Sequence, residues 1–281
     1  MVDVEGYRRT SHDIWDAMAP GWERRRAQLT DALSPVRDWL VRELAPRLGE
    51  TVLELGAGAG DTGFEAAAIV GDGGRLISSD FSADMLEVAR RRGAETGLSN
   101  VEYRVIDAES IDLDTDSVDG VLCQSGYMLM ADPDAALAET RRVLRPGGRV
   151  ALSVWGSPER NPWGAIGAMI LVQRGHMSPP QPGAPGVFSM ASEERTRGLL
   201  EAAGFTHVRT DEVPARFAFR DLDDYESWAM EVAGPLGMVL RGLSEAEREA
   251  LKAELAESFT PFAAPNGGYD LPGVALCAAA S

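Results

Sequence analysis

The feature that most constrains the fold is a glycine-rich turn between a short apolar segment and an alanine-rich one. Residues 51–55, with the sequence TVLEL, are apolar and begin with β-branched character, and the turn GAGAG follows at residues 56–60. Residues 62–70 then have the composition of a helix. A strand that enters a helix through such a turn is typical of parallel α/β sheets, in which ligands bind where the strands end.

The same alternation of strand and helix continues along the first half of the chain. The expected helices carry ordinary end signals: Ser82 is placed as an N-cap with Gly97 as the stop of that helix, and Asp132 precedes Pro133 at the start of the next. Strands that alternate with such helices predict a parallel sheet covered on both faces. The further strands are expected over residues 75–79, 101–106, 118–124 and 149–155.

After the fifth strand the alternation stops and a different organisation begins. Residues 205–213 and 216–219 are strand-like, and residues 274–279 form a last apolar strand. Helical sequence lies between these strands and includes a capping box that begins at Ser244. We therefore expect an inserted helical cap, residues 222–265, that interrupts a late β-hairpin.

The charge balance limits the classes of partner. The chain has 44 acidic and 27 basic residues, which gives a formal net charge of −17. Binding to nucleic acids or to anionic membranes depends on basic groups, so neither partner is expected. No run of about 18 apolar residues occurs, and the first 13 residues lack the apolar centre of a signal peptide. A cytoplasmic protein is therefore expected.

Cysteine and histidine usage argues against a metal centre. Cys123 and Cys277 lie in apolar surroundings 154 residues apart, and we interpret both as buried thiols. Their spacing indicates neither a zinc site nor a disulfide framework. The sequence also lacks a group of His and Cys residues at metal-ligand spacing, so we expect no metal.

Two of three acidic residues near the strand ends stand at positions where a nucleoside could be recognised. Asp80 ends the second strand, 20 residues after Gly60, where a carboxylate can accept two hydrogen bonds from a ribose diol. Asp107 ends the third strand, where it can accept a hydrogen bond from an adenine amino group. Glu54 lies on the first strand, just before the glycine turn.

Taken together, these residues resemble the motifs of class I S-adenosylmethionine-dependent methyltransferases. Residues 54–60, ELGAGAG, resemble the first motif, Asp80 the second-strand acid, and Asp107 with Ala108 the motif at the adenine end. Residues 144–149, LRPGGR, resemble the turn before the fifth strand of this family. The resemblance covers about residues 10–155. It is strongest to the branch that contains the ubiquinone and menaquinone C-methyltransferases, in which a segment similar to residues 19–22, APGW, folds over the cofactor.

The resemblance implies a Rossmann-like α/β fold with a seven-stranded, mostly parallel sheet and helices on both faces. It implies S-adenosyl-L-methionine as the cofactor, with Glu54 bracing the loop. The implied division is an N-terminal helical lid at residues 1–48, a core at residues 49–221 and 266–281, and the cap at residues 222–265. The residues expected to bind the cofactor are Glu54, Gly56, Ala57, Gly58, Gly60, Asp80, Phe81, Met85, Asp107, Ala108 and Gln124.

Two other functions compete with this interpretation. Residues 58–63 match the dinucleotide pattern GxGxxG, which would indicate an NAD(P)-dependent oxidoreductase. In that case the first glycine of the pattern should follow the strand directly, but Gly56 does so and Gly58 comes too late. Asp61 would also repel a pyrophosphate at the start of the helix. A cofactor-binding module without catalysis is the third hypothesis.

Methyl transfer makes modest demands on side-chain chemistry. The reaction is an in-line displacement, so the protein mainly aligns the acceptor and excludes water, and it needs a base only where the acceptor must lose a proton. We expect His176, in the segment after the fifth strand, to be that base. Tyr127 is expected to hold the acceptor or to lie near the sulfonium. The expected partner is a small organic molecule methylated at carbon, oxygen or nitrogen, with homodimer formation left open.

Overall fold

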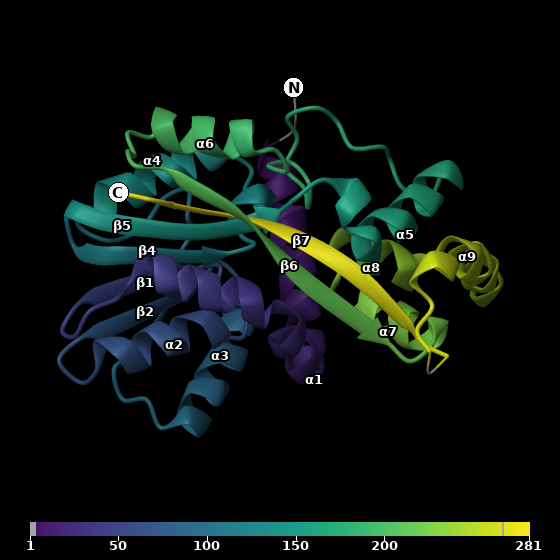
Figure 1. Cartoon of the computed structure of the whole chain (residues 1–281), viewed down its shortest axis with the longest axis horizontal. Coiled ribbons are helices and arrows are strands. Elements are labelled where there is room, and N and C mark those ends of the chain that lie inside the picture. Colours follow the sequence, from purple (N-terminus) through teal and green to yellow (C-terminus); the bar gives the residue numbers. More distant parts are fainter. Residues whose placement is uncertain (1–3, 266) are drawn as a thin grey trace.

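A seven-stranded sheet runs through the computed structural model, which describes residues 4–265 and 267–281 (Figure 1). Its strands are Thr51–Leu55 (β1), Arg75–Asp80 (β2), Val101–Val105 (β3), Val118–Gln124 (β4), Leu144–Trp155 (β5), Arg209–Phe219 (β6) and Tyr269–Ala280 (β7). Their order is β3-β2-β1-β4-β5-β7-β6. The strands β1 to β5 pair in parallel, and β7 is antiparallel to both β5 and β6. The expected Rossmann-like, mostly parallel sheet is therefore confirmed.

Helices cover both faces of this sheet. In Figure 1, α2 and α3 lie on one face, and α4 and α6 lie on the other. The helices are Val4–Leu44 (α1), Asp61–Val70 (α2), Ala83–Thr96 (α3), Pro133–Val143 (α4), Pro162–Gln173 (α5), Glu193–Ala202 (α6), Leu222–Val232 (α7), Pro235–Gly242 (α8) and Glu245–Ser258 (α9). Short 3-10 turns occupy Tyr127–Leu129, Pro158–Arg160 and Thr260–Phe262.

The helix ends follow the predicted cap chemistry. Ser82 accepts a hydrogen bond from the Met85 amide at 3.1 Å, and Gly97 ends α3 in the left-handed conformation. Asp132 caps α4 by accepting from the Ala135 amide at 3.0 Å. Both hydrogen bonds of the capping box that begins at Ser244 are present. These side chains satisfy amides that a helix leaves without partners at its first turn, so the ends of the helices are fixed locally.

The late hairpin differs from the sequence expectation at Pro214. The two expected segments, 205–213 and 216–219, form one strand, β6, that pairs with β7 along its whole length. Because β6 is the last strand of the sheet, a proline there removes no hydrogen bond from a second neighbour. The proline therefore does not divide the strand.

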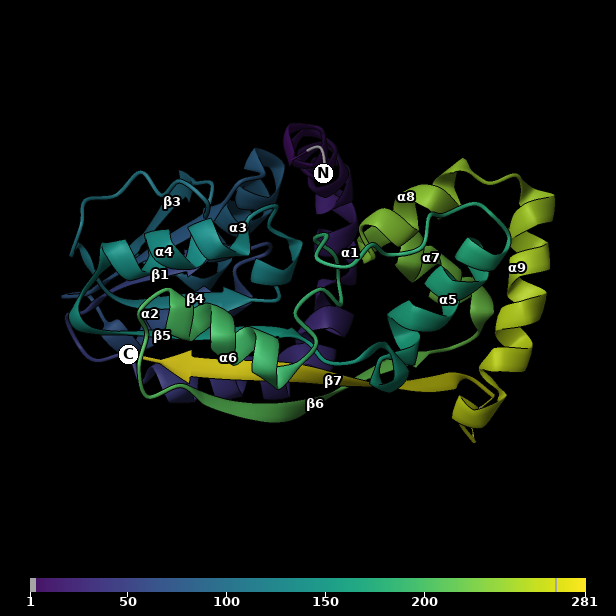
Figure 2. The same cartoon turned by 90° about the horizontal axis from the view of Figure 1, so that it is seen from above.

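Helix α1 is the longest element, with 41 residues and two internal prolines, Pro20 and Pro35. A proline removes one helical hydrogen bond, and the Asp31 carbonyl that Pro35 would leave free accepts one from the Ser34 hydroxyl at 3.0 Å. The C-terminal half of α1 packs against β4, β5, β6 and β7. Figure 2 shows α1 between the parallel strands with their helices and a group formed by α5, α7, α8 and α9.

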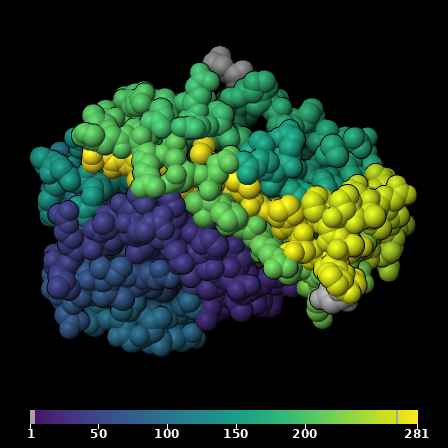
Figure 3. Space-filling model, viewed as in Figure 1, coloured from purple at the N-terminus to yellow at the C-terminus, as the bar shows by residue number. Residues whose placement is uncertain are grey.

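The helices α7, α8 and α9 lie between β6 and β7 along the chain. In the space-filling view, α9 and the start of β7 occupy one end of the molecule, away from α2 and α3 (Figure 3). Residues 1–3 of the expected lid and residue 266 of the expected core lie outside the described residues. The division into lid, core and cap stays a prediction.

Two further expectations concern burial and apolar length. Cys123 and Cys277 are unpaired and fully buried, as predicted, and burial raises the pKa of each thiol to about 12. Within the described ranges, no helix has the length and apolar character needed to cross a membrane.

Candidate functional site

A cavity of about 660 Å³ lies at the carboxyl ends of the parallel strands, beneath α1. Of the residues expected to bind a cofactor, all but Gly60 line this cavity. The remaining lining residues come mostly from one face of α1, from the segment after β4, and from residues 155–235. The cavity is therefore formed where an open α/β sheet binds its ligands.

The glycine turn has a backbone conformation that favours glycine. Gly56 and Gly58 have φ values of 62° and 53°, in the region that favours glycine, and both line the cavity. The Gly58 amide donates to Oδ2 of Asp80 at 2.9 Å, and the Ala57 amide donates to the Ser79 carbonyl at 2.8 Å. The turn from β1 is thus fastened to the end of β2.

Asp80 is held rigidly between two backbone segments. Its carboxylate accepts hydrogen bonds from the Ser82 amide at 3.0 Å and from the Gly58 amide at 2.9 Å. Only 5% of the residue is exposed, and this burial raises the pKa of Asp80 to about 6. Each carboxylate oxygen has further lone pairs, so Asp80 can still accept hydrogen bonds from a ligand in the cavity.

Glu54 faces inward and binds the start of α2. Its carboxyl group accepts from the Gly63 amide at 2.6 Å and from the Ser78 hydroxyl at 3.1 Å. Burial raises the pKa of Glu54 to about 8, so the neutral acid predominates at pH 7. A side chain at Gly63 would overlap the Glu54 carboxyl group, which accounts for the last glycine of the GxGxxG match without a dinucleotide.

The end of β3 contacts the first turns of α1. Asp107 accepts from the Glu109 amide at 2.9 Å and is otherwise exposed at the cavity. Glu109 forms an ion pair with Arg8 and accepts from the Ala131 amide at 2.7 Å. Tyr7 donates to the Leu129 carbonyl at 2.7 Å. These contacts hold the start of α1 across the expected adenine end.

The middle of α1 approaches both the glycine turn and α7. Trp22 packs edge-to-face on Trp15 with ring centres 6.0 Å apart, and its indole donates to the Val232 carbonyl at 3.3 Å. A side chain at Gly21 would overlap the Glu231 backbone, so this glycine permits close contact between the two helices. Arg25 donates to Asp224 at 2.8 Å and to Glu231 at 2.6 Å.

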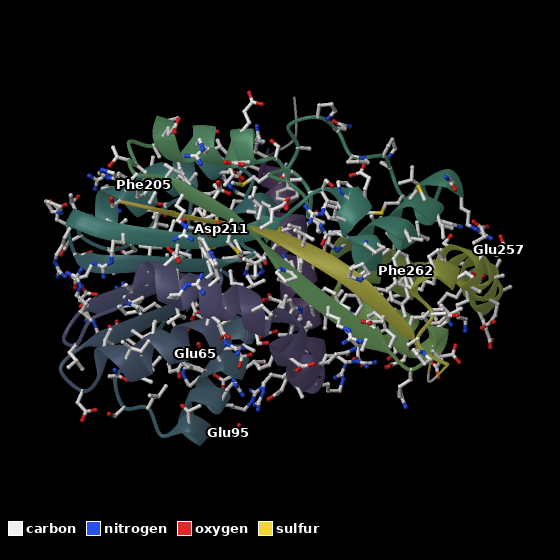
Figure 4. The ribbon with its side chains drawn as sticks, in the orientation of Figure 1. Glu65, Glu95, Phe205, Asp211, Glu257 and Phe262 are labelled. Carbon is white, nitrogen blue, oxygen red and sulfur yellow. The ribbon has the colours of Figure 1, made fainter. Side chains whose placement is uncertain are left out.

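The other half of the cavity has an aromatic wall, formed by Trp155, Trp163, Phe217 and Trp228. Trp155 and Trp163 have ring centres 4.7 Å apart, and Phe217 lies 5.0 Å from Trp163 and 5.5 Å from Trp228. These residues come from β5, α5, β6 and α7, so the fold gathers them from distant parts of the chain. Glu95 and Glu257, in contrast, are exposed and lie at the edges of Figure 4.

The comparisons with known proteins agree with this geometry. Residues 47–166 match a family model described as a methyltransferase domain. The chain is 36% identical over 185 residues to the demethylmenaquinone methyltransferase of Clavibacter sepedonicus. The match covers 59% of this chain and 70% of that protein. The chain belongs to the class I S-adenosylmethionine-dependent methyltransferases. Its cofactor is therefore S-adenosylmethionine, and the dinucleotide alternative is set aside.

Other relatives of this methyltransferase match over a smaller share of their length. An uncharacterized 37.1 kDa transposon protein of Streptomyces fradiae is 39% identical over 153 residues, and the match spans 54% of this chain and 43% of that protein. Among solved structures, the YcgJ protein of Bacillus subtilis has the same fold, with a TM-score of 0.60 and 19% identity over 87% of this chain and 96% of that one. A SAM-dependent methyltransferase from Aquifex aeolicus has a TM-score of 0.51 and 24% identity, covering 65% and 87% of the two chains.

The residues of the methyltransferase fit its cofactor at the adenosine end. The backbone at Gly56 and Gly58 is open to the cavity because neither has a side chain, and Asp80 and Asp107 offer carboxylate oxygens. Phe81 and Met85 line the same part of the cavity, and Gln124 lies at the end of β4, where Oε1 accepts from the Thr62 hydroxyl at 2.7 Å. Within the described part of the chain, no group of three acidic, His or Cys side chains could hold a metal.

Three sequence candidates lie outside the cavity. Gly60 is the N-cap of α2 with φ 85°, and a side chain there would collide with the Phe64 ring, so its role is in the fold. Tyr127 is fully buried and its hydroxyl lies 2.6 Å from that of Thr140, so it is a core residue. His176 follows the end of α5, with Nε2 4.0 Å from a Glu247 oxygen. Neither Tyr127 nor His176 is carried forward as a catalytic candidate.

Sequence reasoning missed the aromatic wall as a unit and the pairing of Arg8 with Glu109. The tryptophans are visible in the sequence, but no local pattern shows that residues from β5, α5, β6 and α7 meet. An ion pair between residues 101 positions apart likewise has no periodic signal. These contacts depend on the tertiary fold alone.

Proposed function

We propose that this methyltransferase transfers a methyl group to a small, largely apolar organic acceptor. The observation that carries the proposal is the composition of a single cavity. Carboxylates suited to adenosine and the aromatic wall line the same cavity. The end of β4, with Gln124 and Ser125, also lines this cavity. The names of three relatives refer to demethylmenaquinone, which supports an apolar acceptor.

The cofactor, when bound, supplies an activated methyl group on a sulfonium. The chain's own residues then have two tasks. Asp80 accepts hydrogen bonds from the ribose diol, and Asp107 accepts from the adenine amino group. Trp15 and Trp22 on α1 exclude water from above, because they line the cavity opposite the glycine turn.

The acceptor half provides alignment without acid–base chemistry. The cavity residues contributed by residues 155–235 include no titratable side chain. The histidine that does line the cavity, His12, lies on the ribose side, where its ring packs on Phe81 at 5.7 Å and Nδ1 is 3.1 Å from Asp16. We therefore propose that catalysis rests on positioning and on exclusion of water.

A two-part experiment tests the proposal. Thermal shift assays with S-adenosylhomocysteine, NAD⁺ and NADP⁺ at the same concentrations should show stabilisation by the first alone. Conversion of S-adenosylmethionine to S-adenosylhomocysteine is then measured with a panel of carbon, oxygen and nitrogen nucleophiles. Binding without turnover on any acceptor would support the non-catalytic module instead. Homodimer formation, a cytoplasmic location and the lack of a nucleic-acid partner stay predictions.

A further inference from the structure

Trp228 carries a buried hydrogen-bond donor that the protein leaves unused. The residue lines the acceptor half of the cavity and is 2% exposed. Its surroundings are aromatic: the ring centres of Trp163, Phe217, Phe219 and Tyr225 lie 5.9, 5.5, 5.3 and 6.2 Å away. Within the described residues, its indole Nε1 has no hydrogen-bond partner.

Other indoles of this chain are satisfied by the protein. Nε1 of Trp163 donates to Oδ1 of Asn161 at 3.1 Å, and Nε1 of Trp39 donates to Asp211 at 3.0 Å. A buried donor without an acceptor is unfavourable, and native proteins keep few of them. Nε1 of Trp228 has almost no accessible surface although the residue lines the cavity, so a ligand oxygen pairs with it once the neighbouring rings shift. A donor of this kind in a cavity-lining residue points to a ligand that completes it.

The rest of the wall defines the chemistry of that ligand. The cavity residues contributed by residues 155–235 are uncharged, and the polar atoms of their side chains are indole nitrogens. An indole N–H donates and does not accept, so the matching ligand atom must be an acceptor. Against these wall residues a charged group would be desolvated without a partner of opposite sign, because charged residues of the same cavity such as Arg26, Arg37 and Asp61 come from α1 and the start of α2. The matching ligand is thus uncharged, flat enough to lie against aromatic rings, and equipped with an oxygen.

The position of Trp228 is fixed by helix α1. Asp224 and Glu231 lie one turn before and after Trp228 on α7, and Arg25 of α1 binds both. The Asp224 amide also donates to Oδ1 of Asp221, the N-cap residue of α7. The indole is thus held by the helix that also covers the glycine turn, so its donor has a defined place relative to the cofactor half.

We infer that Trp228 is a specificity-determining residue, which donates a hydrogen bond from Nε1 to an oxygen of an uncharged, planar acceptor. The inference rests on the proposed function, because it assigns the acceptor of that reaction. An acceptor that lacks the oxygen leaves the donor unpaired and is discriminated against for that reason.

The test compares two probes of the same shape, 2-naphthol and 2-methylnaphthalene, which differ by a hydroxyl in place of a methyl group. Their dissociation constants are measured by fluorescence titration in the presence of saturating S-adenosylhomocysteine. Trp228→Phe removes the donor and keeps an aromatic ring. Trp163→Phe is the matched control, because it makes the same change on the same wall at an indole already bonded to Asn161.

We expect Trp228→Phe to shift the ratio of the two dissociation constants by about 3- to 10-fold against 2-naphthol, the range of one hydrogen bond. Trp163→Phe should change both constants together and leave the ratio within twofold. The indole ¹⁵N–¹H signal of Trp228 in the unmodified protein gives a second readout, which does not depend on folding of a variant. It should move with 2-naphthol and not with 2-methylnaphthalene.

An unchanged ratio in Trp228→Phe, or an indole signal indifferent to the hydroxyl, would overturn the inference. Tight binding of a charged probe such as ethanolamine in place of the naphthalenes would also overturn it. Failure of S-adenosylhomocysteine to stabilise the protein is a different result. That outcome would reject the proposed function itself, before the acceptor half is tested.

Discussion

Substitution of Asp80 by Asn separates recognition of the cofactor from stability of the fold. The carboxylate is 5% exposed and accepts the Ser82 and Gly58 amides at 3.0 and 2.9 Å, so its remaining lone pairs have a fixed direction. Asn has nearly the same shape but lacks the charge, and one of its two positions is an NH₂ donor that cannot accept an amide. Both the ribose diol and one backbone amide therefore lose an acceptor.

The expected change in stability is small because two effects oppose each other. Burial raises the pKa of Asp80 from 3.8 to about 6, so at pH 7 ionisation of this group in the folded protein costs about 3 kcal/mol. Asn removes that cost. Loss of one buried acceptor costs roughly 1–3 kcal/mol in the other direction. The melting temperature of Asp80→Asn should therefore stay within a few degrees of the parent value.

The expected change in binding is large. A hydrogen bond to a charged group contributes about 1.5–3 kcal/mol, so the affinity for S-adenosylhomocysteine should fall by about 10- to 150-fold. Isothermal titration calorimetry measures this change. Asp84→Asn is the matched control, because it removes an equal charge from the exposed first turn of α3, outside the cavity residues.

The same experiment has a pH-dependent part. Asp80 accepts from the diol best as a carboxylate, so affinity in the parent protein should rise between about pH 5 and 7, through its pKa of about 6. Asp80→Asn should lack this rise. Affinity within threefold of the parent, or a pH dependence that survives the substitution, would refute the assignment of Asp80 to the ribose. A melting temperature that collapses together with affinity would assign the residue to the loop alone.

Three further predictions follow from the site. Burial raises the pKa of Glu54 to about 8, so the folded protein keeps a proton that the unfolded chain loses near pH 4.5. The free energy of unfolding should therefore fall as the pH rises from 5 to 8. Glu54→Gln should flatten that slope by up to about 1.4 kcal/mol per pH unit in urea titrations, and an unaltered slope would contradict the burial argument. Gly58 and Gly60 both have positive φ values, so Ala at either position strains the backbone, but only at Gly60 does the new side chain collide with the Phe64 ring. Gly60→Ala should therefore lower the melting temperature by several degrees more than Gly58→Ala, whereas Gly58→Ala should weaken S-adenosylhomocysteine binding more. Equal loss of stability in both would reject this distinction. His176→Asn should leave kcat within threefold of the parent, because the residue does not line the cavity, and a loss above tenfold would return it to the site.

The parts of the site that the sequence predicted are those set by local chemistry. A positive φ at Gly56 and Gly58 follows from the turn between a strand and a helix, and the acid at the end of β2 follows from the register of that strand. The caps at Ser82 and Asp132 depend on amides within three residues. Each of these features needs only a short segment, so a single sequence suffices to find it.

The two catalytic candidates do not line the cavity, because the direction of a side chain depends on more than a short segment. The segment that contains His176 follows the fifth strand, but α5 carries the chain away from the end of β5 before that residue is reached. Tyr127 follows β4 directly, yet its 3-10 turn directs the ring into the core, where burial raises its pKa well above the usual value. The position of a residue along the chain indicates which edge of the sheet it lies near. The direction in which its side chain points depends on packing.

Helix α1 explains why the two halves of the cavity cannot be treated separately. Pro20 interrupts its hydrogen bonding just where Gly21 lets α7 approach, and Trp22 next to them lines the cavity and binds the end of α7. Arg25, one turn further on, fixes the face of α7 that carries the aromatic wall. A helix that lies over the glycine turn and also anchors the aromatic wall links the geometry of one to that of the other. Such a link suits in-line transfer, because the two reactants must be aligned to within about 0.5 Å by groups from distant parts of the chain.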